Sequence, residues 1–242
     1  MHLPDYDLNK IKFATDKPTF EKAIALYGSG KVTQVEEGIR YYSAVVLGTN
    51  PYRVSVEARR YDYGHCICYL GQNDTLCKHM VALAIYAVMD GKPLSEEDKK
   101  QVHNPTSSGR LGVLEDKELS EAKKTIASSL SYIKPYRGPS RIWFSYQNSL
   151  EEGCNRLSAV ISELPVGVTT AQLLVDLLLR LDQKLQIGGV DDSEGTVGGF
   201  IEEVVSVFKD YARIDPECIK SFTKLKGKET CFGWEEPLLK LL

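Results

Sequence analysis

The sequence predicts an α+β protein in two parts: a small module built around an antiparallel sheet, then an all-α domain formed by a helical bundle or by helical hairpins. Three observations support this fold class. Apolar and polar residues alternate between about residues 31 and 60, which is typical of strands with one buried face. Beyond residue 117 apolar residues recur every three or four positions, which is typical of amphipathic helices. At 242 residues, 43% of them apolar, the chain is long enough for two domains.

The first part, residues 1–90, is expected to begin with a helix and to continue as a strand meander. Apolar residues from Phe20 to Tyr27 follow helical spacing, and Gly28-Ser29-Gly30 ends that helix because glycine readily adopts the conformations found at helix ends. Turn residues then separate three alternating segments. We expect strands at 34–36, 39–47 and 52–60.

Residues 91–116 are polar and rich in helix breakers, and we expect them to form a linker with one short helix at 95–101. Limited proteolysis should therefore cut there first.

The helical domain, residues 117–242, should begin its third helix after an N-cap at Thr169 or Thr170. We expect its helices at about 117–132, 142–163, 169–186, 197–212 and 216–225, with caps at Asp192 or Ser193 and at Asp215, and a short apolar end at 234–242.

Four metal-ligating residues stand within fourteen positions: Cys66, Cys68, Cys77 and His79. Three thiolates and one imidazole are a common tetrahedral ligand set for structural zinc. The alternatives are buried thiols or a disulfide framework. A chain of this length does not need disulfides, and its start lacks a basic segment followed by an apolar one, so we expect a cytoplasmic protein that holds zinc.

The spacing also predicts how these ligands are presented. Cys66 and Cys68 are two apart on an extended chain and should share one face, while His65 should point to the other. Gly71 to Asp74 reads as a turn. Cys77 should lie at or before the start of a helix, with His79 in its first turn, because residues two apart diverge within a helix.

The pattern Cys-x-Cys, eight residues, Cys-x-His resembles the SWIM zinc finger, and the similarity covers about residues 18–90. The flanking segments agree with the family's entry strand, hairpin and closing Cys-Lys-His helix: Gly30-Lys31-Val32, Ala44 to Gly48 with Tyr52-Arg53-Val54, and Cys77-Lys78-His79 with Ala82 and Leu83. The resemblance implies a small ββα zinc module that binds DNA or protein partners, without implying a reaction. The helical part loosely resembles helical regions attached to such fingers in prokaryotic proteins.

Cations near the finger and in one later segment are the candidate contacts for a nucleic acid or another partner. The later segment mixes three cations with aromatic residues, a composition that suits single strands or a protein hot spot. The alternative is that its aromatics pack on the helices while its cations stay in water. The net charge of −3 does not favour nucleic-acid binding. The candidates are Arg53, Arg59, Arg60 and Lys78 near the finger, and Lys134, Arg137, Arg141 and Trp143 in the later segment.

An enzyme is disfavoured, because four protein ligands leave a zinc ion no open position and the sequence carries no catalytic triad or phosphate-binding loop. We therefore expect a nucleic-acid-linked binding or regulatory module that contacts DNA or RNA. The alternative is an adaptor whose helical domain docks a protein. We expect no small-molecule substrate and no membrane contact, since the longest apolar run, Met80 to Met89, is half the length of a membrane span.

Overall fold

The computed structural model of the protein describes residues 4–139 and 143–242, and it confirms the α+β fold class: a four-stranded antiparallel sheet is followed by a helical region. The chain divides into two compact units, 1–101 and 102–242. The division falls within the segment expected to be a linker. Within the described residues, no helix is both long enough and apolar enough to cross a bilayer.

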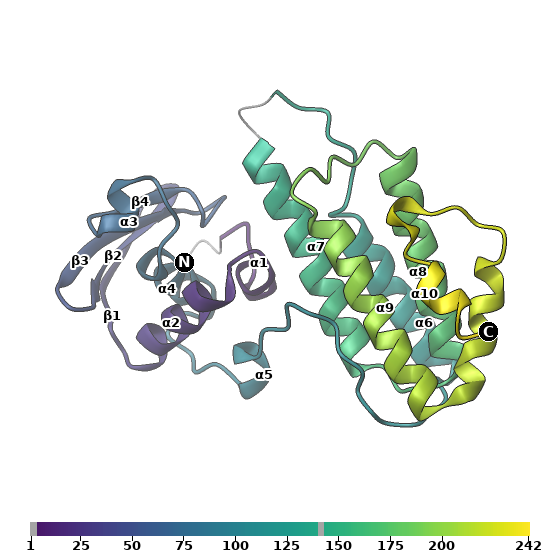
Figure 1. The fold of residues 1–242 in the computed structure, drawn as a ribbon. Helices are drawn as coiled ribbons and strands as arrows, with labels where there is room; N and C mark the ends of the chain where they lie inside the picture. Colours follow the sequence, from purple (N-terminus) through teal and green to yellow (C-terminus); the bar gives the residue numbers. More distant parts are fainter. Residues whose placement is uncertain (1–3, 140–142) are drawn as a thin grey trace. The chain divides into compact units, whose positions relative to one another are not determined.

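The sheet of the first unit runs in the order β1-β2-β3-β4 with antiparallel neighbours (Figure 1). Its inner strands alternate buried and exposed residues, so one face is buried. The register of the β1–β2 pairing shifts between Thr33 and Glu36, as at a β-bulge. Within this irregularity Gln34 adopts a left-handed backbone conformation with φ of 51°. The strands are β1 (Val32–Glu37), β2 (Tyr41–Leu47), β3 (Pro51–Glu57) and β4 (Gly64–Cys66).

One long helix, α4 (Lys78–Met89), packs against β2 and β3, and α2 (Lys17–Gly28) packs against α4 (Figure 1). Small residues such as Ala82 and Ala84 are fully buried in α4 and allow this close packing. The helix α1 (Leu8–Phe13) was not predicted, because six residues are too short to show a clear helical period.

The first unit continues beyond residue 90 to the short helix α5 (Glu96–Lys99), which begins with a capping box between Ser95 and Asp98. The Lys12 ammonium donates to the Glu97 carbonyl at 2.7 Å, and the Gln101 amide donates to the Thr15 carbonyl at 2.7 Å. These hydrogen bonds hold α5 on the unit. The predicted domain bounds and the expected sites of proteolysis remain predictions.

The helices of the second unit pack in adjacent pairs, α6 with α7, α7 with α9 and α8 with α9 (Figure 1). Leu, Val, Ile and Phe side chains fill the space between them. The segment 102–115 belongs to this unit, and its Ser108 hydroxyl donates to the Leu164 carbonyl at 2.7 Å. The helices are α6 (Asp116–Leu130), α7 (Trp143–Glu163), α8 (Val168–Gln186), α9 (Thr196–Ile214), the 3-10 helices η2 (Pro216–Leu225) and η3 (Cys231–Gly233), and α10 (Glu236–Leu239).

The predicted caps of these helices are partly correct. The Asp192 carboxylate accepts hydrogen bonds from the first-turn amides of α9, and the Asp215 side chain caps η2, as expected. The prediction of the N-cap of α8 was wrong. The N-cap is Gly167 and the helix begins at Val168, so Thr169 and Thr170 lie inside its first turn. The neighbouring Val166 pairs with Leu111, which fixes the chain before the helix starts.

A buried carboxylate ties the C-terminal segment to α8. One oxygen of Asp182 accepts from the Cys231 amide at 2.7 Å and from the Trp234 indole at 3.1 Å, and the other accepts from the Gln186 amide at 2.9 Å. Between these donors Phe232 adopts φ of 63°, a strained value for an aromatic residue, and its ring is 77% exposed.

Candidate metal centre

The four predicted ligands come together in the first unit, where β4 ends and α3 (Tyr69–Gln72) and α4 begin. Their ligand atoms all lie within 4.8 Å of one another. The His79 Nδ1 atom lies 3.7 Å from the Cys66 sulfur and 3.8 Å from the Cys77 sulfur. Ligands around one tetrahedral zinc ion are separated by about 3.5–3.8 Å, given the usual bond lengths. The cluster is therefore geometrically able to hold a metal ion.

The strand register places the first ligand. Cys66 is paired with Val54 on β3, and both are buried on the face of the sheet that α4 covers. Cys77 is the N-cap of α4 and His79 lies in its first turn, as the spacing predicted. Cys66, Cys77 and His79 are at most 4% exposed. The cluster therefore joins the sheet to its helix from inside the core.

Cys68 reaches the cluster by a different route from the one predicted. The strand β4 ends at Cys66, so Cys68 is not on a shared strand face and instead is the N-cap of α3. Its sulfur accepts a hydrogen bond from the Gly71 amide at 3.4 Å. The predicted turn from Gly71 to Asp74 is partly helical for the same reason, since Gly71 and Gln72 belong to α3.

Gly71 is required for this tight bend. A Cβ atom at this position would lie 2.3 Å from the Cys66 carbonyl oxygen and 2.5 Å from the Cys66 Cβ. Neither atom can move without displacing the ligand itself. In the sequence this glycine is recognisable only as a turn residue, because the close approach arises when the chain folds back over Cys66.

The thiols of the cluster share their protons unequally. Hydrogen bonding from the Cys66 thiol lowers the pKa of Cys77 to about 4, with further help from His79 and from the Met80 amide at the start of α4. The same hydrogen bond and burial raise the pKa of Cys66. In this folded arrangement Cys77 is the thiolate that can bind a cation first. Cys66 must lose its proton before it can bind a metal.

The imidazole of His79 is held by residues that were not identified as part of the site. Its ring stacks on the Tyr52 ring, with centroids 4.3 Å apart and planes 25° apart. Its Nε2 atom is buried and finds no hydrogen-bond partner among the described residues. A Cβ atom at Gly48 would lie 3.2 Å from this nitrogen, so the glycine leaves room for the ring. The stack keeps Nδ1 turned toward the sulfurs.

The chemistry of the donors fits a zinc-type cation. Three sulfurs and one imidazole nitrogen are soft or borderline ligands, which favour zinc over calcium or magnesium. Four protein ligands fill a tetrahedron, which would leave no coordination position for a water or a substrate. His65 is exposed and lies outside the cluster, as predicted for the neighbour of a buried strand residue.

The predicted cations near the finger are on the surface of the first unit. Arg53 is exposed on β3 and Lys78 is half-buried at the start of α4. Arg59 is 3.8 Å from Asp5, and both side chains are largely exposed. Arg60 is bound to Asp62 at 2.6 Å and lies over the Tyr63 ring, 4.3 Å from its centroid, so part of its charge is already neutralised.

The later set of candidates belongs to the second unit. Lys134 and Arg137 are exposed, and Trp143 is half-buried with its indole donating to the Asp191 carboxylate at 3.0 Å. The Tyr136 ring packs against Tyr146 at 4.8 Å. Arg141 lies outside the described residues. The roles of all these residues in binding remain predictions.

Comparison with known proteins identifies no relative: no protein-family model, no curated protein and no solved structure matches the chain. The SWIM resemblance therefore rests on the ligand pattern and its flanking segments. What the structure adds to that pattern is the spatial cluster of its four ligands.

Proposed function

We propose that the protein is a zinc-binding module of the SWIM type and that its metal has a structural role. The observation that carries this proposal is the grouping of Cys66, Cys68, Cys77 and His79 within 4.8 Å at the junction of sheet and helix. A closed set of four ligands stabilises a fold and offers no site for catalysis, which supports a non-enzymatic function.

The metal proposal is tested on the purified full chain by native mass spectrometry, with one zinc ion expected per chain. Replacing zinc with cobalt should give the visible absorption of a tetrahedral site and a sulfur-to-cobalt charge-transfer band. The variant Cys154→Ser is the matched control, since Cys154 is buried among helices of the second unit and should not alter either measurement. A chain that retains its fold without any metal would overturn the proposal.

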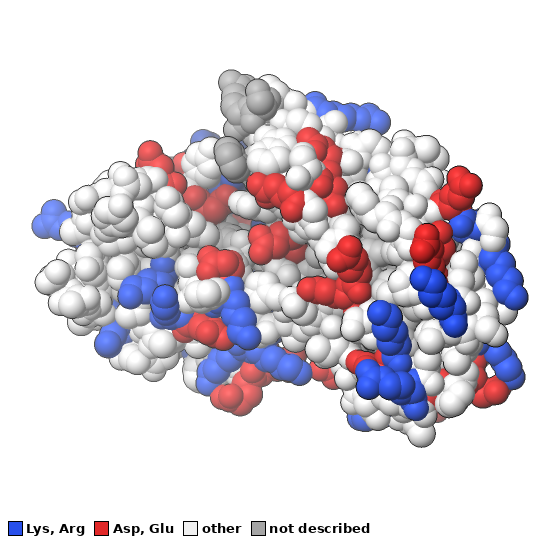
Figure 2. Space-filling model, in the orientation of Figure 1, with Lys and Arg blue, Asp and Glu red and all other residues white. Residues whose placement is uncertain are grey.

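We further propose that the module contributes to nucleic-acid binding. Arg53, Arg59 and Lys78 belong to the unit that holds the metal cluster, and the first two are exposed to contact phosphates. The face shown in Figure 2 carries Lys and Arg side chains interspersed with Asp and Glu. Such a mixed surface, together with the net charge of −3, favours modest rather than tight binding.

A salt titration with duplex and single-stranded DNA tests this function. With three or four cations in contact, the logarithm of the binding constant should fall with the logarithm of salt concentration at a slope of about −3 for duplex DNA. Arg59→Glu combined with Arg53→Glu should weaken binding to all sequences about equally, while Lys224→Glu in the second unit should not. Absence of binding to either DNA at low salt would reject the nucleic-acid function.

The second candidate function is a protein adaptor, favoured by the exposed Phe232 ring. This residue has a strained backbone and lies 3.3 Å from where a Cβ would stand on Gly198, beside a cavity of about 240 Å³ that Trp234 and Pro237 also line. Strained, exposed aromatic residues are often binding residues. A partner docked there should stay bound at high salt and be lost with Phe232→Gly, which suits the positive φ.

A further inference from the structure

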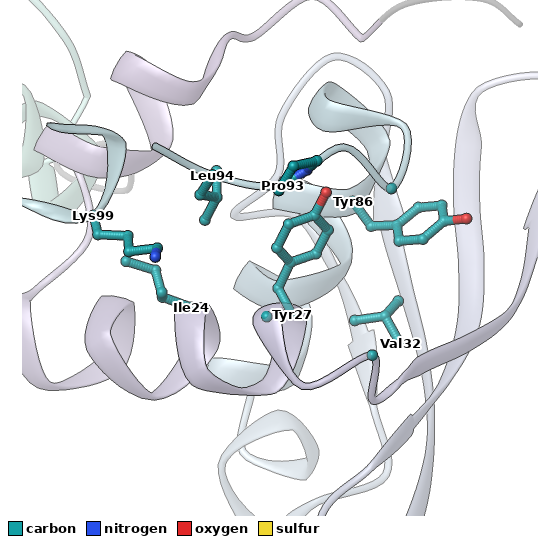
Figure 3. Close-up of a pocket in the computed structure, with 10 residues that line it drawn as sticks. Ile24, Tyr27, Val32, Tyr86, Pro93, Leu94 and Lys99 are labelled. Carbon is teal, nitrogen blue, oxygen red and sulfur yellow. The ribbon is translucent and has the colours of Figure 1, made fainter. Parts of the chain in front are cut away.

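A cavity of about 370 Å³ opens in the first unit near the C-terminal end of α4. It is formed by the end of α2, the start of β1, the last turn of α4, the loop that follows and α5 (Figure 3). The metal cluster lies at the other end of α4, about 10 Å along the helix axis from Tyr86. The cavity is therefore separate from the metal centre.

The walls of this cavity are apolar and aromatic. Ile24, Val32 and Leu94 contribute aliphatic side chains, and the rings of Tyr27 and Tyr86 meet edge to face with centroids 6.2 Å apart. Gly28 and Gly30 also line it, and a Cβ atom added at either would meet no heavy atom within 4 Å. Its volume is at the lower end of the range for small-molecule sites, about 300–1,000 Å³. The space suits a single aromatic ring.

One cation stands at the cavity without an acidic residue in its wall. Lys99 extends from α5 on the side of Ile24 (Figure 3), and none of the described lining residues is Asp or Glu. The Lys99 ammonium binds Glu96 at 2.7 Å, but the Glu96 side chain is 92% exposed. An exposed pair of this kind contributes little, so a ligand carboxylate can replace Glu96 at low cost.

Hydrogen bonds hold the backbone segments around the cavity and the Tyr27 hydroxyl in place. The hydrogen bonds from Lys12 and Gln101 hold α5, and therefore the backbone of Lys99, against the unit. The Tyr27 hydroxyl donates to the Lys92 carbonyl at 2.5 Å, which fixes the loop between α4 and α5. A site whose walls are already positioned loses less entropy when it binds a ligand.

We propose that this cavity binds a small aromatic carboxylate, with the ring between Ile24, Leu94 and the two tyrosines and the carboxylate on Lys99. The apolar walls select the ring. The Lys99 ammonium selects an anion over a neutral or cationic molecule, because a ligand carboxylate can replace the exposed Glu96 side chain while no acidic residue lines the described wall of the cavity.

The test is a titration of the purified, isotope-labelled full chain with phenylacetate, followed by the amide NMR signals of Gly28, Gly30 and Gly91, which all line the cavity. These three signals should shift and saturate. Phenylacetamide, which has the same ring without the charge, should bind about tenfold more weakly, and acetate should leave the signals unchanged. Unshifted signals, or equal affinity for phenylacetate and its amide, would overturn the proposal.

Two exposed or half-exposed positions make the test specific. Lys99→Gln should weaken phenylacetate about tenfold and leave phenylacetamide unchanged, whereas Lys99→Arg should retain binding. Ile24→Glu should abolish phenylacetate binding, because a second carboxylate would stand in the cavity. Lys22→Gln, on an exposed position of α2 outside the cavity, is the matched control. Unaltered phenylacetate affinity in both Lys99→Gln and Ile24→Glu would refute the assignment.

Discussion

The two units of this chain bury their cores in different ways. The first covers one face of a four-stranded sheet with a single helix and places three potential metal ligands, Cys66, Cys77 and His79, inside that contact. The second interlocks Leu, Val, Ile and Phe side chains between neighbouring helices. A cluster of thiolates and an imidazole gains its stability from the ion that it binds, whereas the second core, in which Cys154 and Cys218 are buried as isolated thiols outside the cluster, does not depend on a cation. We infer that loss of the metal lowers the free energy of unfolding of the first unit and leaves that of the second unit unchanged.

The largest expected effect comes from Cys77→Ser. Zinc contributes about 10 kcal/mol or more to the folding of isolated zinc-finger peptides, so the first unit should unfold while the second stays folded. Both tryptophans, Trp143 and Trp234, belong to the second unit. Tryptophan fluorescence should therefore be unchanged, while the dispersed NMR signals of residues 31–90 collapse.

The control for this experiment is Cys231→Ser, since Cys231 is a half-buried cysteine of the second unit outside the cluster. It should leave both units folded and zinc bound. If Cys77→Ser unfolded both units together, or unfolded neither, the inference that only the first unit depends on the metal would be wrong.

Gly71→Ala should have the next largest effect, because the added Cβ collides with the backbone of Cys66. We expect the first unit to lose about 3 kcal/mol and to bind zinc more weakly. Gly28→Ala is the control, since a Cβ there meets no heavy atom within 4 Å. Chemical denaturation, followed by signals of the first unit, measures both. Equal stability of the two variants would show that the bend at Cys68 tolerates a side chain.

Asp182→Ala tests the second unit by a route that does not involve the metal. It leaves the Trp234 indole and the Cys231 amide without their shared acceptor, which should cost about 2 kcal/mol. Tryptophan fluorescence should shift and the second unit should unfold at lower denaturant, with zinc content unchanged. Asp182→Asn keeps one acceptor oxygen and should be milder. A loss of zinc in Asp182→Ala would contradict the separation of the two units.

The smallest expected effect is on the protons released when zinc binds. Zinc requires thiolates, and thiols of an unfolded chain are protonated at neutral pH, so zinc affinity rises with pH and falls in acid. Because the metal-free first unit is expected to be unfolded, an indicator dye in weak buffer should report close to three protons released per zinc at pH 7. Release of two protons or fewer would contradict this prediction. That result would indicate a metal-free site that keeps its folded arrangement, in which the pKa of Cys77 is lowered to about 4.

Much of the site could be predicted from the sequence, because ligand spacing limits which residues reach one ion. Cys77 and His79 were placed correctly on their helix for this reason. Cys68 was not, because β4 ends at Cys66, two residues before Cys68, and the Cys68 thiol caps α3 instead. The stack of Tyr52 on His79 depends on how β3 and α4 pack, which local periodicity does not encode.

The helices of the second unit were predicted well, since long amphipathic segments carry a strong period. The predicted 169–186 and 216–225 correspond to α8 and η2 within one residue at each end. Their start signals were less reliable. Thr169 and Thr170 were both suitable caps for α8, but the N-cap is Gly167, two residues before Thr169, and it directly follows the residue Val166 that pairs with Leu111. Tertiary pairing had overridden a local signal.

The irregular pairing of β1 and the shortness of β4 have a consequence for how molecules of this protein meet. These are the two outer strands of the sheet, and open strand edges are the usual starting points for fibre growth. In β1 the register shift beside Gln34 interrupts the strand edge, and Glu36 and Glu37 add negative charge to it. The other edge strand, β4, has three residues and is too short to pair stably with a strand of another molecule. The sheet is thereby protected from extending into a neighbouring molecule.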